Sequence, residues 1–346
     1  MKRYAAMLLA MVLLTGCAKA TDNNSEKGAE AEKVSELPEL TEDTVKEIEA
    51  QDYDNFTFAE DFDLSYDTTA RIYEVRLYDP LADNYEAVFS HYSEGFTSEN
   101  VEAHEEALIY EDDKVFVLKT DRGGFTVSDK DCLNKVIYGN SVDYLSTDIL
   151  SSAADKRLAI GSTDIGISEL ENSCLEFLTD FYAVADYPDI IEPYSVSMQI
   201  VDGANAATVH CRTVFEGLPV FDTMSTKRDH SFEIAELPPC VFIFLEGSEV
   251  GQFAVGQSFE KVSEEPADII TPLSAMNAAS EKLSGFAQWE VQSEELALMP
   301  EFTDNAQTTL RLTPYWVIWF DQSWWYETFA AVNAVTGEVD FVNNAG

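Results

Sequence analysis

The C-terminal part of the chain carries the pattern that most restricts the fold. Thr271 followed by Pro272 is typical of a helix start, because threonine caps a first turn and proline fits the first helical position. Gly285 ends the helix that they predict, because glycine readily adopts the left-handed backbone found after helices. Alternating apolar residues then predict strands over 289–298 and 308–320. A helix followed by antiparallel strands indicates the α+β class.

The middle of the chain shows the same order of elements. Apolar residues at spacings of three and four predict a helix over 167–185, and two strand patterns follow it. Two related helix-plus-sheet units and an N-terminal β-rich region are therefore expected, while residues 129–163 are predicted to be irregular. The predicted helices cover 41–50, with Thr41 as N-cap, 84–94, 167–185 and 271–283; the predicted strands cover 56–58, 71–78, 114–119, 125–127, 194–201, 206–215, 217–222, 240–245, 250–255, 289–298, 308–320, 329–335 and 338–342.

Changes in composition divide the chain into five predicted segments. An acidic stretch without aromatic residues precedes a folded part that is rich in phenylalanine and tyrosine, so the stretch is expected to be a flexible tether. The predicted segments are 1–16, a signal peptide; 17–50, the anchor and tether; 51–163, an N-terminal α+β region; 164–265, a middle α+β module; and 266–346, a C-terminal module.

The charge of the chain excludes one large class of partners. The formal net charge is −43, with 64 acidic residues against 21 basic ones. Nucleic-acid binding is excluded because it needs a basic surface. The excess of carboxylates either keeps the protein soluble or favours a basic partner.

The N-terminus has the features of an export signal. A basic start, Met1-Lys2-Arg3, precedes an apolar run from Tyr4 to Leu14 and a small-residue site. The segment Leu14-Thr15-Gly16-Cys17 resembles the lipobox of bacterial lipoproteins. The resemblance implies a diacylglycerol on Cys17, with acyl chains such as palmitate. It also implies attachment to the extracytoplasmic face of the cell membrane of a Gram-positive-type bacterium. An ordinary signal peptide or a short membrane anchor is the alternative.

The C-terminal strands also resemble a known kind of module. The residues are Ala287-Gln288-Trp289-Glu290-Val291, Leu312-Thr313-Pro314-Tyr315-Trp316 and Ala331 to Val339, which resemble PepSY-like modules, with Trp289 in place of the usual tyrosine. The stretch Phe215 to Asp222 is similar to a strand of YycH/YycI-type regulators of a sensor histidine kinase. The order of these segments along the chain is also similar to that in clostridial lipoproteins of unknown function. The resemblance covers about residues 165–343 and implies a fold but no active centre.

Catalytic and metal-binding motifs are missing from the sequence. The four histidines show no zinc-protease spacing, and the acidic clusters lack the turning glycine of a calcium loop. We therefore predict no enzyme activity, no metal site and no cofactor. Beyond Cys17, four cysteines allow three disulfide pairings, and the sequence leaves open whether they are bridged: Cys132, Cys174, Cys211 and Cys240.

The expected function is binding in the cell envelope. The first hypothesis is a non-catalytic surface lipoprotein that binds a protein or peptide partner, with a regulatory role, through exposed strand edges. The second is a protein that binds a small solute or glycan through three exposed tryptophans, Trp319, Trp324 and Trp325, since such rings stack on sugars and grip peptides. The third is a hydrolase whose site is assembled from distant residues.

Overall fold

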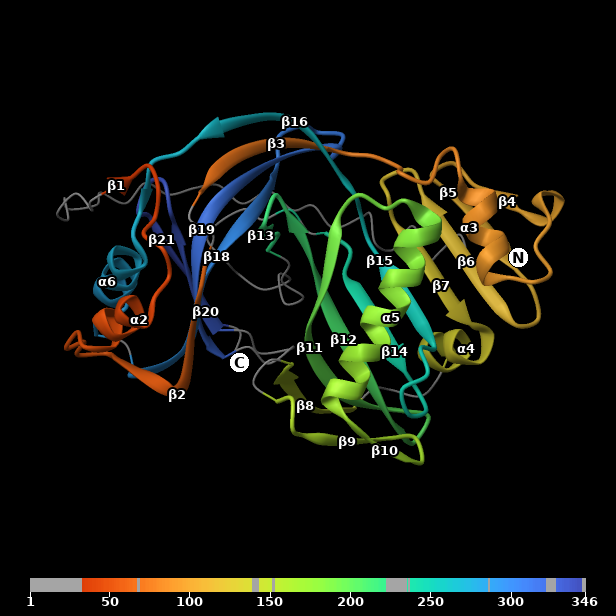
Figure 1. The fold of residues 1–346 in the computed structure, drawn as a ribbon, viewed down its shortest axis with the longest axis horizontal. Helices are drawn as coiled ribbons and strands as arrows, with labels where there is room; N and C mark the ends of the chain where they lie inside the picture. The colour runs from red at the N-terminus through yellow and green to blue at the C-terminus, as the bar shows by residue number, and fades with distance from the viewer. Residues whose placement is uncertain are drawn as a thin grey trace. The chain divides into compact units, whose positions relative to one another are not determined.

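A computed structural model shows an α+β protein in which strands predominate (Figure 1). It describes residues 33–66, 69–138, 143–150, 153–221, 235, 237–285, 287–321 and 328–343. Within these ranges the chain forms five α-helices and mostly antiparallel strands, so the predicted α+β class is confirmed. No helix in the described ranges is long and apolar enough to cross a membrane.

Short helices alternate with many strands along the chain. The helices are α2 (Glu42–Glu49), α3 (Tyr85–Tyr92), α4 (Lys130–Tyr138), α5 (Ile167–Ala185) and α6 (Pro272–Lys282), with one short 3-10 helix, η1 (Ser98–Asn100). The strands are β1 (Lys33–Val34), β2 (Phe56–Ser65), β3 (Arg71–Leu77), β4 (Glu102–Ala103), β5 (Ala107–Glu111), β6 (Val115–Thr120), β7 (Phe125–Asp129), β8 (Asp143–Ile149), β9 (Arg157–Ile160), β10 (Thr163–Gly166), β11 (Ile190–Val201), β12 (Ala204–Phe215), β13 (Leu218–Pro219), β14 (Cys240–Phe244), β15 (Gln252–Val255), β16 (Phe259–Pro266), β17 (Ile269–Ile270), β18 (Trp289–Phe302), β19 (Thr309–Asp321), β20 (Thr328–Asn333) and β21 (Val339–Asn343).

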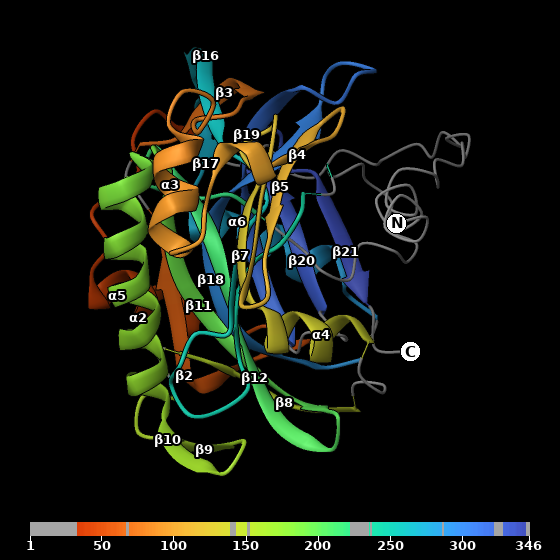
Figure 2. The ribbon, with the colours of Figure 1, turned by 90° about the vertical axis from the view of Figure 1, so that its right-hand side faces the viewer.

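One sheet has ten strands. Its order is β4-β5-β6-β7-β15-β14-β12-β11-β8, and β13 pairs with β12. Helices α3 and α5 lie side by side on one face of this sheet (Figure 1, Figure 2). Helix α5 buries the apolar face predicted from its spacing, and Asp186 ends it in a left-handed conformation, with φ 50°. The buried face consists of Ile167, Leu170, Cys174, Leu178, Phe181 and Ala185.

The second large sheet has seven strands. Its order is β16-β3-β19-β18-β2, with β20 and then β21 beside the second half of β19. Strand β18 pairs with β19 over ten residues, from Ser293 opposite Trp319 to Phe302 opposite Leu310. Strand β2 pairs with β18 in the parallel direction. Figure 1 shows β18, β19 and β3 as neighbouring long strands.

The local predictions at turns and caps are confirmed. The Thr41 side chain accepts a hydrogen bond from the Thr44 N–H at 3.3 Å and caps α2. The hairpin of β20 and β21 turns at Gly337, whose φ is 78°. The Asn333 side chain accepts hydrogen bonds from the Val335 and Thr336 N–H groups, both at 2.9 Å, and holds that turn.

The prediction that residues 129–163 are irregular is wrong. They contain α4, β8 and β9, although only residues 129–138, 143–150 and 153–163 are described. The Asp129 carboxylate accepts hydrogen bonds from the Asp131 and Cys132 N–H groups, which satisfies the first turn of α4. Strand β8 forms because β11 offers an unpaired edge to it. These short elements depend on a cap and on a distant strand, so their own sequence pattern is weak.

Strand pairing divides the chain differently from the predicted segments. The segment 51–163 does not form a sheet of its own. Its strands β2 and β3 pair with β18 and β19 of the segment 266–346, whereas its strand β7 pairs with β15 of the segment 164–265. The N-terminal region is therefore shared between the two large sheets, and the predicted helix-plus-strand units are completed by strands from outside them.

A buried polar network connects the turn of β6 and β7 to the start of β16. The Asp189 carboxylate accepts hydrogen bonds from the Ser258 hydroxyl at 2.6 Å and from the Phe259 N–H at 3.0 Å. Burial raises the pKa of Asp189 to about 6 despite these donors. Gly123 has a φ of 89°, and a side chain there would collide with the backbone nitrogen of Ser258. Only glycine fits both the conformation and the space.

Glu294 is a fully buried carboxylate on β18. It stands opposite Ile318 of β19 and beside Leu64 of β2, so it shares the face of the sheet that buries apolar side chains. Both of its carboxylate oxygens lack a hydrogen-bond partner among the described residues. Burial raises its pKa well above the ordinary value of 4.5, because desolvation disfavours the charged form.

We predict that Glu294→Gln stabilises the protein at neutral and alkaline pH. The folded-state pKa of Glu294 is raised, so its contribution to stability is complete below about pH 4.5 and is lost as the pH rises through the folded-state pKa. Removing the charge should increase the free energy of unfolding at pH 8 by about 1–3 kcal/mol. Urea unfolding between pH 4 and pH 9 measures this. The control is Glu290→Gln, an exposed glutamate on the same strand. Equal pH profiles for wild type and Glu294→Gln would contradict the prediction.

Candidate functional site

Trp319 is buried rather than exposed, which corrects the expectation of an open tryptophan patch at this position. Its exposed fraction is 5%. Its ring lies 5.9 Å from the Phe221 ring at 23° and 5.0 Å from the Phe329 ring. Trp319 does lie on the face of β19 opposite Trp316, as the alternation predicts, but that second face is also buried. The cluster around it contains Phe221, Ala297, Met299, Val317, Phe329, Ala331 and Val342.

The other predicted site residues lie outside the described ranges. Trp324 and Trp325 fall in the segment 322–327, and Cys17 falls in the segment 1–32. Their roles in ligand binding and in lipidation therefore remain predictions from the sequence.

Glu295 connects the two large sheets. One of its carboxylate oxygens accepts a hydrogen bond from Arg212 Nη1 of β12 at 2.7 Å, and the other accepts one from Trp319 Nε1 at 3.1 Å. Arg212 Nε lies 3.5 Å from a carboxylate oxygen of Glu192, and its guanidinium lies 4.8 Å from the centre of the Tyr194 ring. Burial alone would lower the pKa of Arg212, but Glu295 raises it above its ordinary value. This cluster holds a permanently charged arginine between carboxylates, so its role is to stabilise the contact between the two sheets.

Two groups of mostly half-buried aromatic side chains, one on β2 and one around Trp289 of β18, are joined through the rings of Tyr53 and Phe56. The rings of Phe58 and Phe62 on β2 meet edge to face at 5.0 Å. Trp289 of β18 lies 5.4 Å from both Phe320 of β19 and Phe341 of β21. We call Phe58, Phe62, Trp289, Phe320 and Phe341 the aromatic edge. Phe58, Phe62, Trp289 and Phe341 are all partly exposed.

Strand β2 brings the aromatic edge to the border of the sheet. It is the last strand in the sheet order, and among the described strands it pairs only with β18. Phe58 pairs with Val291 and Asp63 pairs with Ser293, so residues 59–62 bulge opposite Gln292 alone. Within the bulge Glu60 and Asp61 are exposed, which gives this border a negative charge.

Trp289 carries an unsatisfied hydrogen-bond donor at this border. Its indole Nε1 is buried and has no hydrogen-bond partner among the described residues. A buried donor left without a partner costs about 1–3 kcal/mol. The nitrogen is closed to solvent, so a peptide carbonyl from outside would recover that cost only after a shift of the indole ring. Sequence analysis places Trp289 in a strand but misses this role, because the neighbours of its indole come from distant segments.

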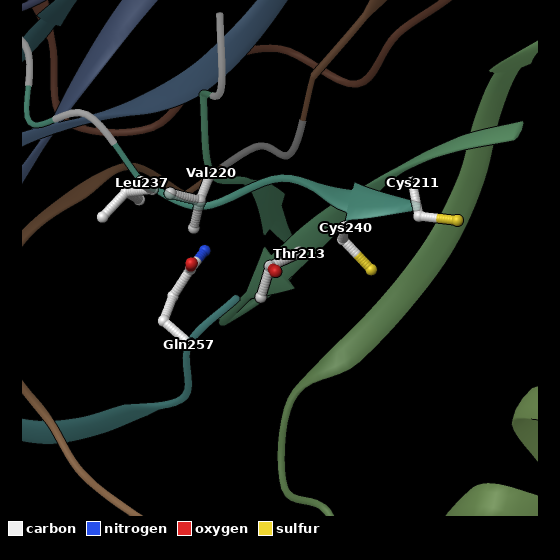
Figure 3. A pocket seen from close by; sticks show the side chains of 6 residues that line it. All are labelled: Cys211, Thr213, Val220, Leu237, Cys240 and Gln257. Atoms are coloured by element: carbon white, nitrogen blue, oxygen red, sulfur yellow. The ribbon is translucent and has the colours of Figure 1, made fainter. Parts of the chain in front are cut away.

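A small pocket lies beside β12 and β14 (Figure 3). Its empty volume is about 220 Å³, including space open to solvent, which is below the roughly 300–1,000 Å³ of most small-molecule sites. The buried Gln257 Oε1 has no hydrogen-bond partner among the described residues. The lining residues are Cys211, Thr213, Val220, Leu237, Cys240 and Gln257. This pocket is too small to support the solute-binding hypothesis.

The titratable groups singled out in the sequence have structural partners. His91 lies 2.6 Å from Asp180, and His210 lies 3.0 Å from the Ser197 hydroxyl in the buried interior. Asp112 accepts hydrogen bonds from two backbone N–H groups and two hydroxyls, which lower its pKa although burial opposes this. No group of three His, Cys, Asp or Glu side chains in the described ranges could hold a metal ion. His230 lies outside those ranges.

Comparisons with known proteins bear on the fold alone. No protein-family model and no curated protein matches the sequence. The structure is similar to the crystal structure of an uncharacterized protein from Eubacterium rectale, with a TM-score of 0.56 and 11% sequence identity. The match covers 86% of this chain and 97% of that one. At this identity the likeness supports a common fold and gives no activity.

We predict that Trp319→Ala lowers the free energy of unfolding more than Trp289→Ala does. Trp319 is fully packed and hydrogen-bonded, so its truncation should cost about 3–5 kcal/mol of unfolding free energy. Trp289 is half-buried and its indole N–H is unsatisfied, so its truncation should cost less. Urea unfolding of the two variants measures the difference. A Trp319→Ala protein as stable as wild type would contradict this prediction.

Proposed function

We propose that this chain is a non-catalytic, lipid-anchored protein of the extracytoplasmic membrane face that binds an extended protein or peptide segment at the aromatic edge. The observation that carries the proposal is the buried, unsatisfied indole N–H of Trp289 beside the open border of β2. A partner strand lying along β2 would offer apolar side chains to the rings of Phe58 and Phe62, and a shift of the Trp289 ring on the neighbouring strand β18 would let its N–H donate to a partner carbonyl.

Aromatic side chains suit this role. Tryptophan and other aromatic residues contribute much of the binding energy of protein interfaces, because they bury a large area at a low entropy cost. The aromatic edge is partly exposed, whereas the cluster around Trp319 is closed. The aromatic edge therefore has surface left to bury on association.

The chemistry of the partner follows from charge. Glu60 and Asp61 are exposed on the bulge of β2, Asp63 follows on the same strand, and the whole chain has a net charge of −43. An acidic segment would be repelled, whereas a segment with lysine or arginine beside apolar residues would be attracted and guided to the site. We therefore propose a basic, extended partner segment.

The lipid anchor and the C-terminal module belong to the same proposal. The lipobox-like segment ending at Cys17 supports attachment through diacylglycerol, and the order of α6 followed by β18, β19, β20 and β21 supports a PepSY-like module. Two acyl chains suffice for stable attachment, even for a domain that anionic lipid repels. The anchor would hold the aromatic edge near its partners in the envelope, as a regulatory role requires.

We predict that Trp289→Phe weakens binding of a basic peptide about tenfold. Phenylalanine keeps an aromatic ring, although a smaller one, and removes the N–H; one hydrogen bond is worth about 1–1.5 kcal/mol, or roughly tenfold in Kd. The probe is a fluorescent peptide of alternating lysine and valine, with a glutamate and valine peptide as its acidic counterpart. Fluorescence anisotropy with the detergent-solubilised full chain measures the Kd values.

The matched control for this experiment is Tyr85→Phe. It also removes one polar hydrogen from an aromatic side chain, but on α3, away from the seven-stranded sheet. The control should bind the basic peptide like wild type, and the acidic peptide should bind neither protein. Equal affinities of wild type and Trp289→Phe, or no preference for the basic peptide, would overturn the proposed site.

We predict that Cys17→Ala releases the protein from the detergent-rich phase in a phase-separation assay. Without the thiol, no diacylglycerol can be attached, so the anchor is lost. Cys132→Ala, which removes a buried thiol of the folded part, should still partition into the detergent phase. A Cys17→Ala protein that stays in the detergent phase would show that another segment anchors the chain.

A further inference from the structure

Three of the four cysteines in the folded part of the chain lie together in the core under α5. Cys211 of β12 and Cys240 of β14 are directly opposite each other in the antiparallel pairing. Cys174 of α5 belongs to the same cluster and lies near enough that its charge would raise the pKa of Cys211. All three side chains belong to one buried cluster, and all are free thiols in the structure. Cys132, near the start of α4, lies outside that cluster.

We propose that Cys211 and Cys240 are a modification site at which an oxidant forms a cross-strand disulfide. Residues directly opposite each other in antiparallel strands have Cα atoms about 4.5–5.5 Å apart. Disulfides need a Cα separation of about 4.4–6.8 Å, so this pair meets the requirement without a shift of the backbone. Direct partners in an antiparallel pair project their side chains from the same face of the sheet, and in Figure 3 both sulfur atoms point away from Val220 and Leu237.

The chemistry is a two-electron oxidation by a disulfide. Each thiol loses its proton, the two sulfur atoms form a bond, and the two electrons reduce the disulfide bond of the oxidant to two thiols. The oxidant is thus a low-molecular-weight or protein disulfide. An exported chain meets such oxidants outside the cytoplasm, so this step in the cell rests on the proposed location.

Burial determines when the reaction takes place. Both thiols of the pair are buried in the core, and desolvation raises the pKa of Cys211, so an oxidant reacts slowly with the reduced pair in the folded protein. The bond therefore forms during folding, after β12 and β14 have paired and before α5 covers them. Once formed, it is shielded from reductants by the same helix. Cys174 is the third thiol of the core and is not needed for this bond.

The test is oxidative refolding of the full chain. The protein is unfolded in urea with reductant, then refolded in detergent and a glutathione redox buffer, and its recovery is checked by circular dichroism. Cyanogen bromide cleaves after methionine and places Cys211 in fragment 199–224, Cys240 in fragment 225–276, and both Cys132 and Cys174 in the fragment that ends at Met198. Mass spectrometry without reductant then identifies which fragments are joined.

We expect fragments 199–224 and 225–276 to be joined in at least tenfold excess over the separate fragments. The same crosslink should form in Cys174→Ser and should be lost in Cys240→Ser. Native, reduced protein should acquire it at least tenfold more slowly than refolding protein, because α5 covers the thiols. Refolded wild type and Cys174→Ser with both fragments free, or with fragment 225–276 joined to the fragment ending at Met198, would overturn the proposal. Neither result depends on the anchor or on the aromatic edge.

Discussion

The antiparallel pairing of β18 with β19 is the interaction on which the seven-stranded sheet depends. Strand β19 carries β3 and β20 on its other side, and β18 carries β2, so the sheet is assembled around these two strands. The register also determines the surroundings of two adjacent carboxylates. Glu295 faces Arg212 and Trp319, whereas Glu294 faces the apolar side and lacks a partner among the described residues. A slip of one residue would exchange the two faces and leave Arg212 without its carboxylate.

The distribution of charge fits a surface that selects its partner. Several basic side chains of the seven-stranded sheet are already paired with carboxylates: Arg71 with Glu264, Arg76 with Glu260 and Arg311 with Glu265. Such exposed pairs contribute little to stability, but they neutralise the few cations of the sheet. The remaining carboxylates, including those on the bulge of β2, are left to set the potential around the aromatic edge. That arrangement favours binding of a basic segment at the edge of β2 over binding of an uncharged or acidic one.

The sequence was sufficient where the determinants are local. Helices α5 and α6 and the hairpin of β20 and β21 follow from apolar spacing, a threonine cap and a turning glycine, all within a few residues. It was insufficient for β8, which forms on the open edge of β11, and for the pairing of β2 and β3, whose partner strands lie more than a hundred residues away. It was also insufficient for the surroundings of Trp289, because Phe320 and Phe341 come from other strands of the sheet. For Trp319 a usable signal existed. The apolar run from Tyr315 to Phe320 covers both faces of the strand, which is typical of a strand buried on both sides.

The pairing of β2 with β18 has a consequence for the order in which the protein can fold. Phe56 lies near the N-terminal end of the described chain, yet its neighbour in the sheet is Trp289, and β1 likewise pairs with β17. The first strands to leave a ribosome or an export channel therefore have no partners until most of the chain has followed. Closing such a long loop makes folding slow and leaves early strands exposed. The high negative charge of the chain would then oppose aggregation through the unpaired N-terminal strands, because unfolded copies repel one another before the sheet is complete.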